Sequence, residues 1–391
     1  MSDCLIIGGG VIGLSLAYEL AGCGLKVRLI EAGTPGREAS WAGAGILPPA
    51  AAHSADPLEQ LTALSNRMHA AWHEELASTT GIDNGYRRTG AIYLARNREL
   101  DQQLGEFIQA ATSGGIANEL LDRGNLAKIE PALNPRELLS ACLLEDEAQI
   151  RNPRHLRALM AGCIERGVEI TSGAIAQGFE IRRGRVQSVR TNLGPLAADQ
   201  FCMTAGAWSS ELCERLGIIA RIKPVRGQML LLSTPMPVLS RIVNEGRRYL
   251  VPRDDGRVLV GSTEEDVGFD RSTTANAIAG LLEFAIGLVP TLARATLERF
   301  WAGLRPATED GWPYLGPVPD VENAFVAAGH FRSGLQLSTA TARVMGQLVR
   351  GLAPEIDLER FRVDRHAGTR RADKDAPNRS EQARRKSEPI S

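Results

Sequence analysis

A glycine-rich turn between a short apolar run and a helical pattern is the feature that most constrains the fold of this chain. The apolar run 4–7 predicts a buried strand, and it leads directly into Gly-Gly-Gly-Val-Ile-Gly at 8–13. Apolar residues at helical spacing follow as far as Gly22, and a second apolar run, 27–30, ends at Glu31. This order predicts a strand–helix–strand unit at the start of the chain.

The turn and Glu31 together predict a dinucleotide site. Glycines let the backbone approach a pyrophosphate closely, and the helix that follows offers the positive end of its dipole. Glu31 stands about 20 residues beyond the loop, where an acid accepts hydrogen bonds from ribose hydroxyls. The motif alone leaves FAD and NAD open. The predicted contacts here are Gly8, Gly10, Val11, Ile12, Gly13, Glu31 and Ala32.

Composition narrows the class of protein. The chain has 391 residues, 43% of them hydrophobic, and a formal net charge of −1. This length predicts two packed domains, and the charge balance excludes a bulk basic field for nucleic acid. The sequence contains no run of about 18 apolar residues, so we expect no membrane span. Its first residues predict a strand and not a signal peptide. We therefore expect a cytoplasmic protein.

Neither the cysteines nor the histidines predict a metal site. The six cysteines form no C-x-x-C pair, so their spacing supports neither zinc nor a dithiol redox centre. His69 and His73 stand at i, i+4, but they lack a third ligand and the H-E-x-x-H pattern. We interpret the pair as part of a surface helix.

Hydrophobic periodicity places the remaining elements, and composition sets apart the end of the chain. The polar, aromatic-free segment 366–391 contains basic clusters and predicts a disordered tail. Predicted helices cover 57–80, 98–112, 156–166, 275–289 and 334–351, and strands recur through 168–205, 225–263 and 324–327.

A run of small residues at 38–47 is the second candidate site segment. Its composition lets backbone approach a flat ligand, although a loop packed tightly against a helix would use the same residues. The predicted cofactor contacts in this run are Ser40, Trp41, Gly45, Ile46 and Leu47.

Several blocks in order resemble the glycine oxidase branch of the D-amino acid oxidase family, over residue 3 to about residue 365. They lie at 38–47, 145–153, 205–209, 249–253, 300–306 and 328–334. The resemblance implies FAD and an α/β fold, with a Rossmann-like FAD-binding domain and a substrate domain built on a mainly antiparallel sheet. We assign 1–85, 140–215 and 300–365 to the first domain, and 86–139 and 216–299 to the second.

The resemblance also implies the catalytic residues. Arg305 would hold a substrate carboxylate above the flavin, because a planar guanidinium binds a carboxylate bidentately. Tyr249 could donate to the same carboxylate, although an aromatic at a strand start is often a core residue. Arg332 stands in a loop before a predicted helix, where positive potential would favour reduced flavin. The further implied cofactor contacts are Ile175, His330, Phe331, Arg332, Ser333, Gly334, Leu335 and Gln336.

The function that the resemblance implies is oxidative deamination of glycine or a small amine. Hydride would pass to flavin and oxygen would be reduced to hydrogen peroxide, with the glycine imine possible as a precursor for the thiazole half of thiamine. Sarcosine oxidase relatives of this family attach the flavin through a cysteine in the C-terminal part of the chain. No cysteine follows Cys213 here, so the resemblance implies non-covalent FAD. Family analogy also suggests a tetramer.

Two alternatives remain open at this point. One is a flavin dehydrogenase or oxidase for D-amino acids or sarcosine that uses another electron acceptor. The other is a flavin-binding protein without catalysis, which would not need the pair Arg305 and Tyr249. Glu264 and Glu265 stand where a relative has an apolar residue, and an acid entering the pocket would favour a cationic substrate portion.

Overall fold

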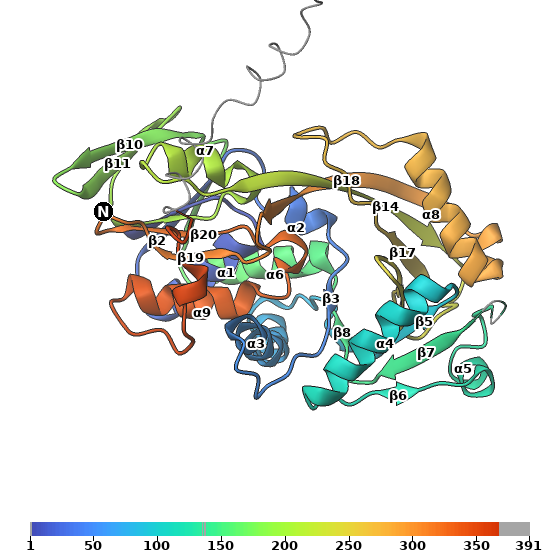
Figure 1. Ribbon diagram of the computed structural model, residues 1–391. Helices are drawn as coiled ribbons and strands as arrows, with labels where there is room; N and C mark the ends of the chain where they lie inside the picture. The colour runs from blue at the N-terminus through green and yellow to red at the C-terminus, as the bar shows by residue number, and fades with distance from the viewer. Residues whose placement is uncertain (1, 135, 137, 367–391) are drawn as a thin grey trace, which may run out of the picture.

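The computed structural model describes residues 2–134, 136 and 138–366. The first strand of the chain belongs to a six-stranded, mainly parallel sheet. A second, larger sheet stands beside it, and long strands run from one region to the other (Figure 1). The predicted α/β class, with a parallel sheet and a mainly antiparallel partner sheet, is confirmed. The predicted tail lies outside the described residues, apart from His366.

The parallel sheet is built around the predicted strand–helix–strand unit. Strand β1 pairs in parallel with β2 on one side and with β13 on the other, while β19 closes one edge antiparallel to β20. Its order is β19 (Tyr314–Pro317), β20 (Ala324–Ala328), β13 (Ala198–Met203), β1 (Ser2–Ile7), β2 (Val27–Glu31) and β9 (Glu169–Ser172).

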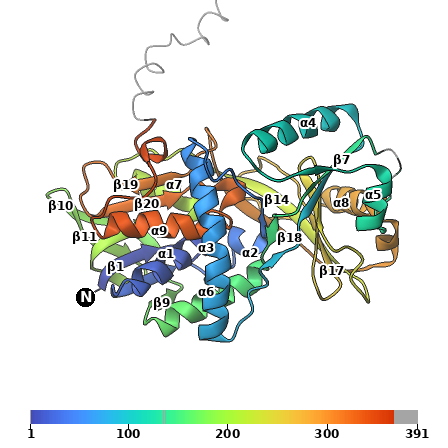
Figure 2. The same cartoon turned by 90° about the horizontal axis from the view of Figure 1, so that it is seen from below.

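Successive residues of β1 are buried on opposite faces of this sheet, because both faces of the sheet are covered by other elements. Cys4 and Ile6 join a core with the helices shown in Figure 2, whereas Leu5 and Ile7 pack against the other layer. The first layer contains α1 (Val11–Gly22), α3 (Pro57–Thr80), α6 (Asn152–Glu165) and α9 (Ser338–Val349). The second contains β10 (Ala176–Arg182), β11 (Arg185–Thr191), β12 (Gly194–Leu196), η1 (Gly206–Trp208) and α7 (Ser209–Glu214).

The larger sheet has eight strands and is antiparallel except where β15 meets β5. One of its faces packs on α5 (Arg123–Ile129) and α8 (Ala275–Leu288), and the edge near β5 and β7 packs on α4 (Arg98–Ser113). Its order is β18 (Thr296–Thr308), β14 (Ile222–Ser233), β17 (Arg257–Gly261), β16 (Arg248–Pro252), β15 (Ile242–Glu245), β5 (Ala91–Ala95), β7 (Ser140–Leu144) and β6 (Glu119–Leu120).

Strands β14 and β18 connect the two regions. They form one long antiparallel ladder, and β18 also packs against the one-turn helix α2 (Ala39–Ala42). At the junction, Arg253 donates to the Ala44 carbonyl oxygen at 2.8 Å and to Gln149 Oε1 at 2.6 Å. This clamp ties the large sheet to a small sheet made of β3 (Ile46–Leu47), β8 (Ala148–Gln149) and β4 (Arg87–Arg88).

Most predicted elements form where periodicity places them, with two differences near the pocket. The helix expected from residue 334 begins at Ser338 and is preceded by a 3-10 turn, η3 (Phe331–Ser333). Phe331 takes a φ of 46°, which a continuous right-handed helix does not allow. The run 38–47 contains the helical turn α2, which sequence composition did not indicate. The short 3-10 turns η2 (Pro290–Arg294) and η4 (Glu359–Phe361) complete the described chain.

His69 corrects one sequence interpretation, because it lies inside the protein and not on a surface helix. It is 0% exposed, and its Nε2 lies 3.0 Å from the carbonyl oxygens of Leu335 and Gln336. Burial lowers the pKa of His69 to about 4, so the ring is neutral and its Nε2–H can donate to both carbonyls. No cluster of three metal-ligating side chains occurs within the described residues. No helix there is long and apolar enough to cross a membrane.

The close approach of α1 to β1 can be tested at Gly13. A Cβ at this position would lie 1.9 Å from the Gly8 carbonyl oxygen and 2.6 Å from Thr204 Oγ1. Backbone cannot move away without displacing the strand, so we expect Gly13→Ala to cost about 1–3 kcal/mol or more in unfolding free energy. Thermal unfolding followed by circular dichroism measures the loss.

Gly105→Ala is the matched control, because this helical glycine of α4 has open space around its Cβ position. It should leave stability unchanged or raise it by up to about 1 kcal/mol. Equal stability of the two variants would contradict the packing described here.

Candidate active site

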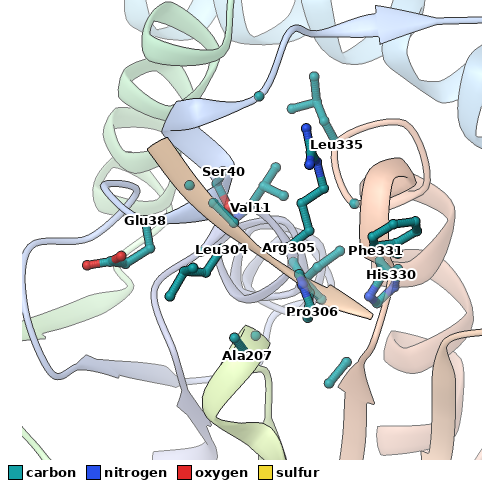
Figure 3. A pocket seen from close by; sticks show the side chains of 18 of the residues that line it. Val11, Glu38, Ser40, Ala207, Leu304, Arg305, Pro306, His330, Phe331 and Leu335 are labelled. Carbon is teal, nitrogen blue, oxygen red and sulfur yellow. The ribbon is translucent and has the colours of Figure 1, made fainter. Parts of the chain in front are cut away.

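A pocket of about 700 Å³ lies between the parallel sheet and the large sheet. Its wall includes the glycine turn before α1, the run 38–47, the middle of β18 and the segment 327–336. Figure 3 shows Arg305 rising from β18 into this space, with Val11 and Ser40 nearby and Phe331 across from it. The pocket is therefore made from segments of both sheets and from both ends of the chain.

The glycine turn leaves open backbone at the start of α1. Gly8 has a φ of +115°, and a Cβ there would lie 2.5 Å from the Thr204 carbonyl oxygen. Only glycine fits this combination of backbone angle and close approach. Gly10 is the residue before the helix, and Val11 N–H donates to Ser40 Oγ at 2.9 Å. The turn thus presents backbone and a helix N-terminus to the pocket, as an anionic ligand requires.

Glu31 stands at the end of β2 and lines the pocket beside Ala32. Its carboxylate accepts from the backbone N–H of Gly9 at 2.7 Å and from that of Gly33 at 2.9 Å. A carboxylate has about four acceptor positions, so these two bonds orient it and leave capacity for hydroxyl donors.

The run 38–47 is pressed against Asn152, a residue that sequence reasoning did not select as a contact. A Cβ at Gly43 would lie 2.8 Å from Asn152 Nδ2, and one at Gly45 would lie 2.5 Å from Asn152 Oδ1. Asn152 also donates from Nδ2 to the Ser40 carbonyl oxygen at 2.7 Å. Because Gly45 has a φ of +78°, both geometry and space require glycine there. The small residues therefore serve helix packing and pocket shape together.

One face of the large sheet contributes a row of directly paired residues. Tyr93, Asn244, Tyr249, Gly261 and Met229 are register partners on β5, β15, β16, β17 and β14. Directly opposed residues point to the same face of a sheet, so their side chains form a continuous strip. All of these except Gly261 line the pocket. The strip is the floor of the cavity.

Arg305 lies over a glycine of the neighbouring strand. A Cβ at Gly227 would stand 2.2–2.3 Å from three atoms of the Arg305 guanidinium, so any side chain there would occupy the same space. The guanidinium donates to the Thr263 carbonyl oxygen at 3.0 Å and to Ser262 Oγ at 2.8 Å. Neither acceptor carries a charge.

Arg305 has no carboxylate within 4.0 Å among the described residues, although it is partly buried. Burial lowers its pKa from the usual 12.5, Tyr249 opposes this, Arg332 lowers it further and Glu264 opposes it again. A cation in this setting attracts an anionic ligand, because an unpaired buried charge is unfavourable.

Tyr249 packs against Gly261 and is 8% exposed. A Cβ at Gly261 would lie 2.5–2.7 Å from the ring and hydroxyl, so this glycine makes room for the tyrosine. The hydroxyl lies 3.8 Å from Met229 Sδ, a weak acceptor. Tyr249 is thus both a core residue and part of the pocket wall, and its side chain also interacts with the Arg305 guanidinium, whose pKa it raises.

The segment after β20 brings His330, Phe331 and Arg332 to the pocket. His330 is 4% exposed, and burial lowers its pKa to about 3, so the ring is neutral. Its Nε2 lies 3.1 Å from Thr341 Oγ1 on α9. Arg332 belongs to the 3-10 turn η3, between β20 and α9, so it precedes the helix.

The predicted residues separate into a large group that lines the pocket and a small group behind it. Gly13, Trp41 and Leu47 lie behind the wall: Gly13 packs α1 on β1, Trp41 packs its ring on Trp301, and Leu47 is 2% exposed. The lining group is Gly8, Gly10, Val11, Ile12, Glu31, Ala32, Ser40, Gly45, Ile46, Ile175, Tyr249, Arg305, His330, Phe331, Arg332, Ser333, Gly334, Leu335 and Gln336.

Glu147 is a buried acid next to the pocket that sequence reasoning missed. It is 0% exposed and accepts from Tyr93 Oη at 2.7 Å and from Asn244 Nδ2 at 3.5 Å. Burial raises the pKa of Glu147 to about 7, which the two hydrogen bonds only partly oppose. The acidic block 145–147 in the sequence was a signal, but nothing in it distinguished the one buried carboxylate from its exposed neighbours.

Comparisons with known proteins agree with this geometry. The family model described as FAD dependent oxidoreductase matches residues 3–348. The chain belongs to this family. It is 36% identical to the glycine oxidase of Pseudomonas putida, over 90% of this chain and 96% of that protein. The crystal structure of glycine oxidase from Geobacillus kaustophilus superposes with a TM-score of 0.89 at 33% identity, covering 93% of this chain and 99% of that one.

A further relative of this FAD-dependent oxidoreductase is a longer protein with a bifunctional name. The bifunctional protein ThiO/ThiG of Synechocystis sp. is 33% identical over 89% of this chain, which spans 51% of that protein. The residues present fit FAD, since the cavity offers open backbone at a helix N-terminus, an acid at the end of β2 and glycines where a Cβ would fill the space.

Gly227→Ala tests the space that the guanidinium of Arg305 occupies. We expect the variant to fold and retain FAD but to lose at least about tenfold in kcat/KM, because displacing Arg305 by about 1 Å misplaces whatever it holds. Steady-state oxygen uptake gives kcat/KM, and the absorbance ratio of protein to flavin gives cofactor content.

Gly280→Ala is the control for this variant, because its Cβ position is open. Unchanged kcat/KM in Gly227→Ala would show that Arg305 does not position the substrate.

Glu147→Gln tests the buried carboxyl by its pH dependence. The folded pKa of about 7 is above the usual 4.5, so between these values the folded protein holds a proton that the unfolded chain has lost. Stability from this group is therefore lost as pH rises from about 4.5 to 7, by up to about 3 kcal/mol. The melting temperature of Glu147→Gln relative to wild type should rise between pH 5 and pH 8.

Glu145→Gln, at an exposed neighbouring carboxylate, should show no such trend. A parallel pH response of Glu147→Gln and wild type would contradict a raised pKa at Glu147.

Proposed function

We propose that this enzyme oxidatively deaminates glycine or a similarly small amino acid, with oxygen as the electron acceptor. The observation that carries the proposal is Arg305, a partly buried guanidinium in the pocket that has no carboxylate partner among the described side chains. An amino acid carboxylate supplies the missing charge and matches the two-pronged geometry of a guanidinium. The names of the relatives support the same substrate class.

The chain's own part in the reaction is to bind and orient the substrate. Ser262 and Thr263 hold the guanidinium from neutral acceptors, so its charge stays available for the substrate carboxylate. Tyr249, which lines the same pocket and interacts with the Arg305 guanidinium, offers its hydroxyl to the same carboxylate. A carboxylate fixed at two points limits the directions in which the amine and Cα can lie, which is how positioning accelerates a reaction.

Bound in this pocket, FAD would supply the two-electron oxidation that converts the substrate amine to an imine, with oxygen as the final acceptor and hydrogen peroxide as its product. The glycine turn, Glu31 and the run 38–47 would hold it, with the segment 330–336 along its other side. Arg332 would add positive potential at that end. His330 is neutral with a pKa of about 3, so it supplies neither charge nor a ready proton acceptor.

The pocket also bears on the alternatives. A flavin-binding protein without catalysis needs no unpaired guanidinium beside its cofactor, so Arg305 opposes that alternative. Neither Glu264 nor Glu265 lines the pocket, so the structure offers no support for a cationic substrate portion at those residues. The proposal includes supply of the glycine imine for the thiazole half of thiamine, which the name of the bifunctional ThiO/ThiG relative supports. Non-covalent FAD, the tetramer and a cytoplasmic location stay predictions from the sequence.

The proposal is tested by adding glycine to the oxidised holoenzyme without oxygen. We expect the flavin absorbance to bleach, and re-admitted oxygen to restore it with formation of hydrogen peroxide. Acetate, which has the carboxylate but no amine, should bind without bleaching. A flavin that glycine, D-alanine and sarcosine all leave oxidised would refute the proposal.

Arg305→Ala tests the carboxylate anchor itself. The variant should retain FAD but lose about a hundredfold or more in kcat/KM for glycine, since it removes two charge-assisted hydrogen bonds worth together roughly 3 kcal/mol. Arg294→Ala removes an exposed arginine of η2 and should leave kcat/KM unchanged. Similar kinetics for the two variants would remove Arg305 from the mechanism.

A further inference from the structure

Glu264 stands between two arginines at the edge of the pocket. Its Oε1 lies 2.9 Å from Arg247 Nη1, and its Oε2 lies 3.5 Å from Arg332 Nη1. Arg332 lines the pocket, whereas the other two do not. Arg332 also donates from Nη2 to the Arg247 carbonyl oxygen at 3.3 Å, which closes the group into a small network.

The carboxylate of Glu264 is shared unequally. The shorter contact goes to Arg247, whose side chain is 73% exposed, and the longer one goes to Arg332, whose side chain is 35% exposed. Water weakens the attraction in exposed ion pairs, so at equal distance Glu264 would attract the less exposed Arg332 more strongly than Arg247. Arg332 is therefore a pocket cation that Glu264 neutralises only in part.

Glu265 cannot take over this role. Its carboxylate binds Arg226 and also accepts from Gln228 Nε2 at 2.8 Å. Its backbone pairs with that of Arg226, so the chain is extended here and successive side chains point to opposite sides. Burial raises the pKa of Glu265, but hydrogen bonds from Thr263, Arg226 and Gln228 outweigh it and leave the pKa below its usual value. Glu264 is thus the acid that faces Arg332 within the described chain.

The charges near the substrate position follow from these contacts. Arg305 lies close enough to Arg332 and Glu264 that both change its pKa, in opposite directions. A substrate bound by one carboxylate at Arg305 leaves its remaining part in the field of Arg332 and Glu264. An uncharged remainder is indifferent to that field, whereas a second carboxylate would be drawn to Arg332 and repelled by Glu264.

We propose that Glu264 is a specificity-determining residue, which occupies the charge of Arg332 and thereby selects amines with one carboxylate over amines with two. This inference rests on the proposed function for the identity of the anchor at Arg305. Rejection by a like charge is a general way to obtain specificity without improving the contacts of the preferred substrate. Removing the charge of Glu264 should turn Arg332 into a second carboxylate site.

The variant that tests this is Glu264→Gln, which keeps the size of the side chain and one acceptor oxygen. We expect the ratio of kcat/KM for iminodiacetate to kcat/KM for glycine to rise about tenfold or more, mainly through a lower KM for iminodiacetate. Added salt should reduce the gain, since Arg332 is partly exposed. Asp266→Asn is the matched control, because it removes an exposed acid paired with Lys223, and it should leave the ratio within about twofold.

A binding measurement separates this inference from the proposed function. Acetate and malonate, which are not oxidised, are titrated into holoenzyme while the flavin absorbance is followed. Glu264→Gln should tighten malonate relative to acetate whether or not glycine is turned over. Glycine turnover failing while this shift appears would therefore reject the proposed function alone.

The double variant Glu264→Gln with Arg332→Gln completes the test. The gain for iminodiacetate and malonate should disappear if Arg332 is the group that Glu264 occupies. The proposal is overturned if the selectivity of Glu264→Gln equals that of wild type in both measurements. It is equally overturned if the gain survives the loss of Arg332.

Discussion

The ladder between β14 and β18 is the interaction on which the rest of the site depends. Its register places Gly227 opposite Gly303 and Val225 opposite Arg305, so the guanidinium of Arg305 lies over Gly227. A shift by one residue would turn every side chain of β18 to the other face of the sheet. The same strand carries Trp301, whose Nε1 donates to the Ala42 carbonyl oxygen at 3.1 Å. One pairing therefore joins the substrate floor to the cofactor side of the pocket.

Close approach of backbone is the second condition for this pocket. Gly303 leaves room for the Ala42 methyl group, whose Cβ would lie 2.5 Å from a Cβ at Gly303, and Gly45 leaves room for the Ile150 carbonyl oxygen. At each of these places the missing side chain of a glycine lets two elements pack closely together beside the cavity. Glycine in this enzyme thus shapes the site as much as the polar residues do.

Protonation states and side-chain positions in and around the pocket are fixed by burial and by hydrogen bonds. His330 and His69 are held neutral by burial, and Glu31 is oriented by two backbone N–H groups. The free positive charge is concentrated at Arg305, with Arg332 partly balanced by Glu264. An amino acid carboxylate meets this distribution directly, and a preorganised charge needs no rearrangement when the substrate binds.

Local sequence by itself determined the strand–turn–helix at the N-terminus, the helices with clear periodicity and the small residues of 38–47, because each depends on neighbours close in the chain. The resemblance to a known family added Arg305, Tyr249 and Arg332 as candidate catalytic residues. Only the tertiary structure brought Gly227 under Arg305, buried His69 against Leu335 and isolated Glu147 beside Tyr93. Those relations join residues that are distant in sequence, and strand register and burial, which no local pattern encodes, decide them.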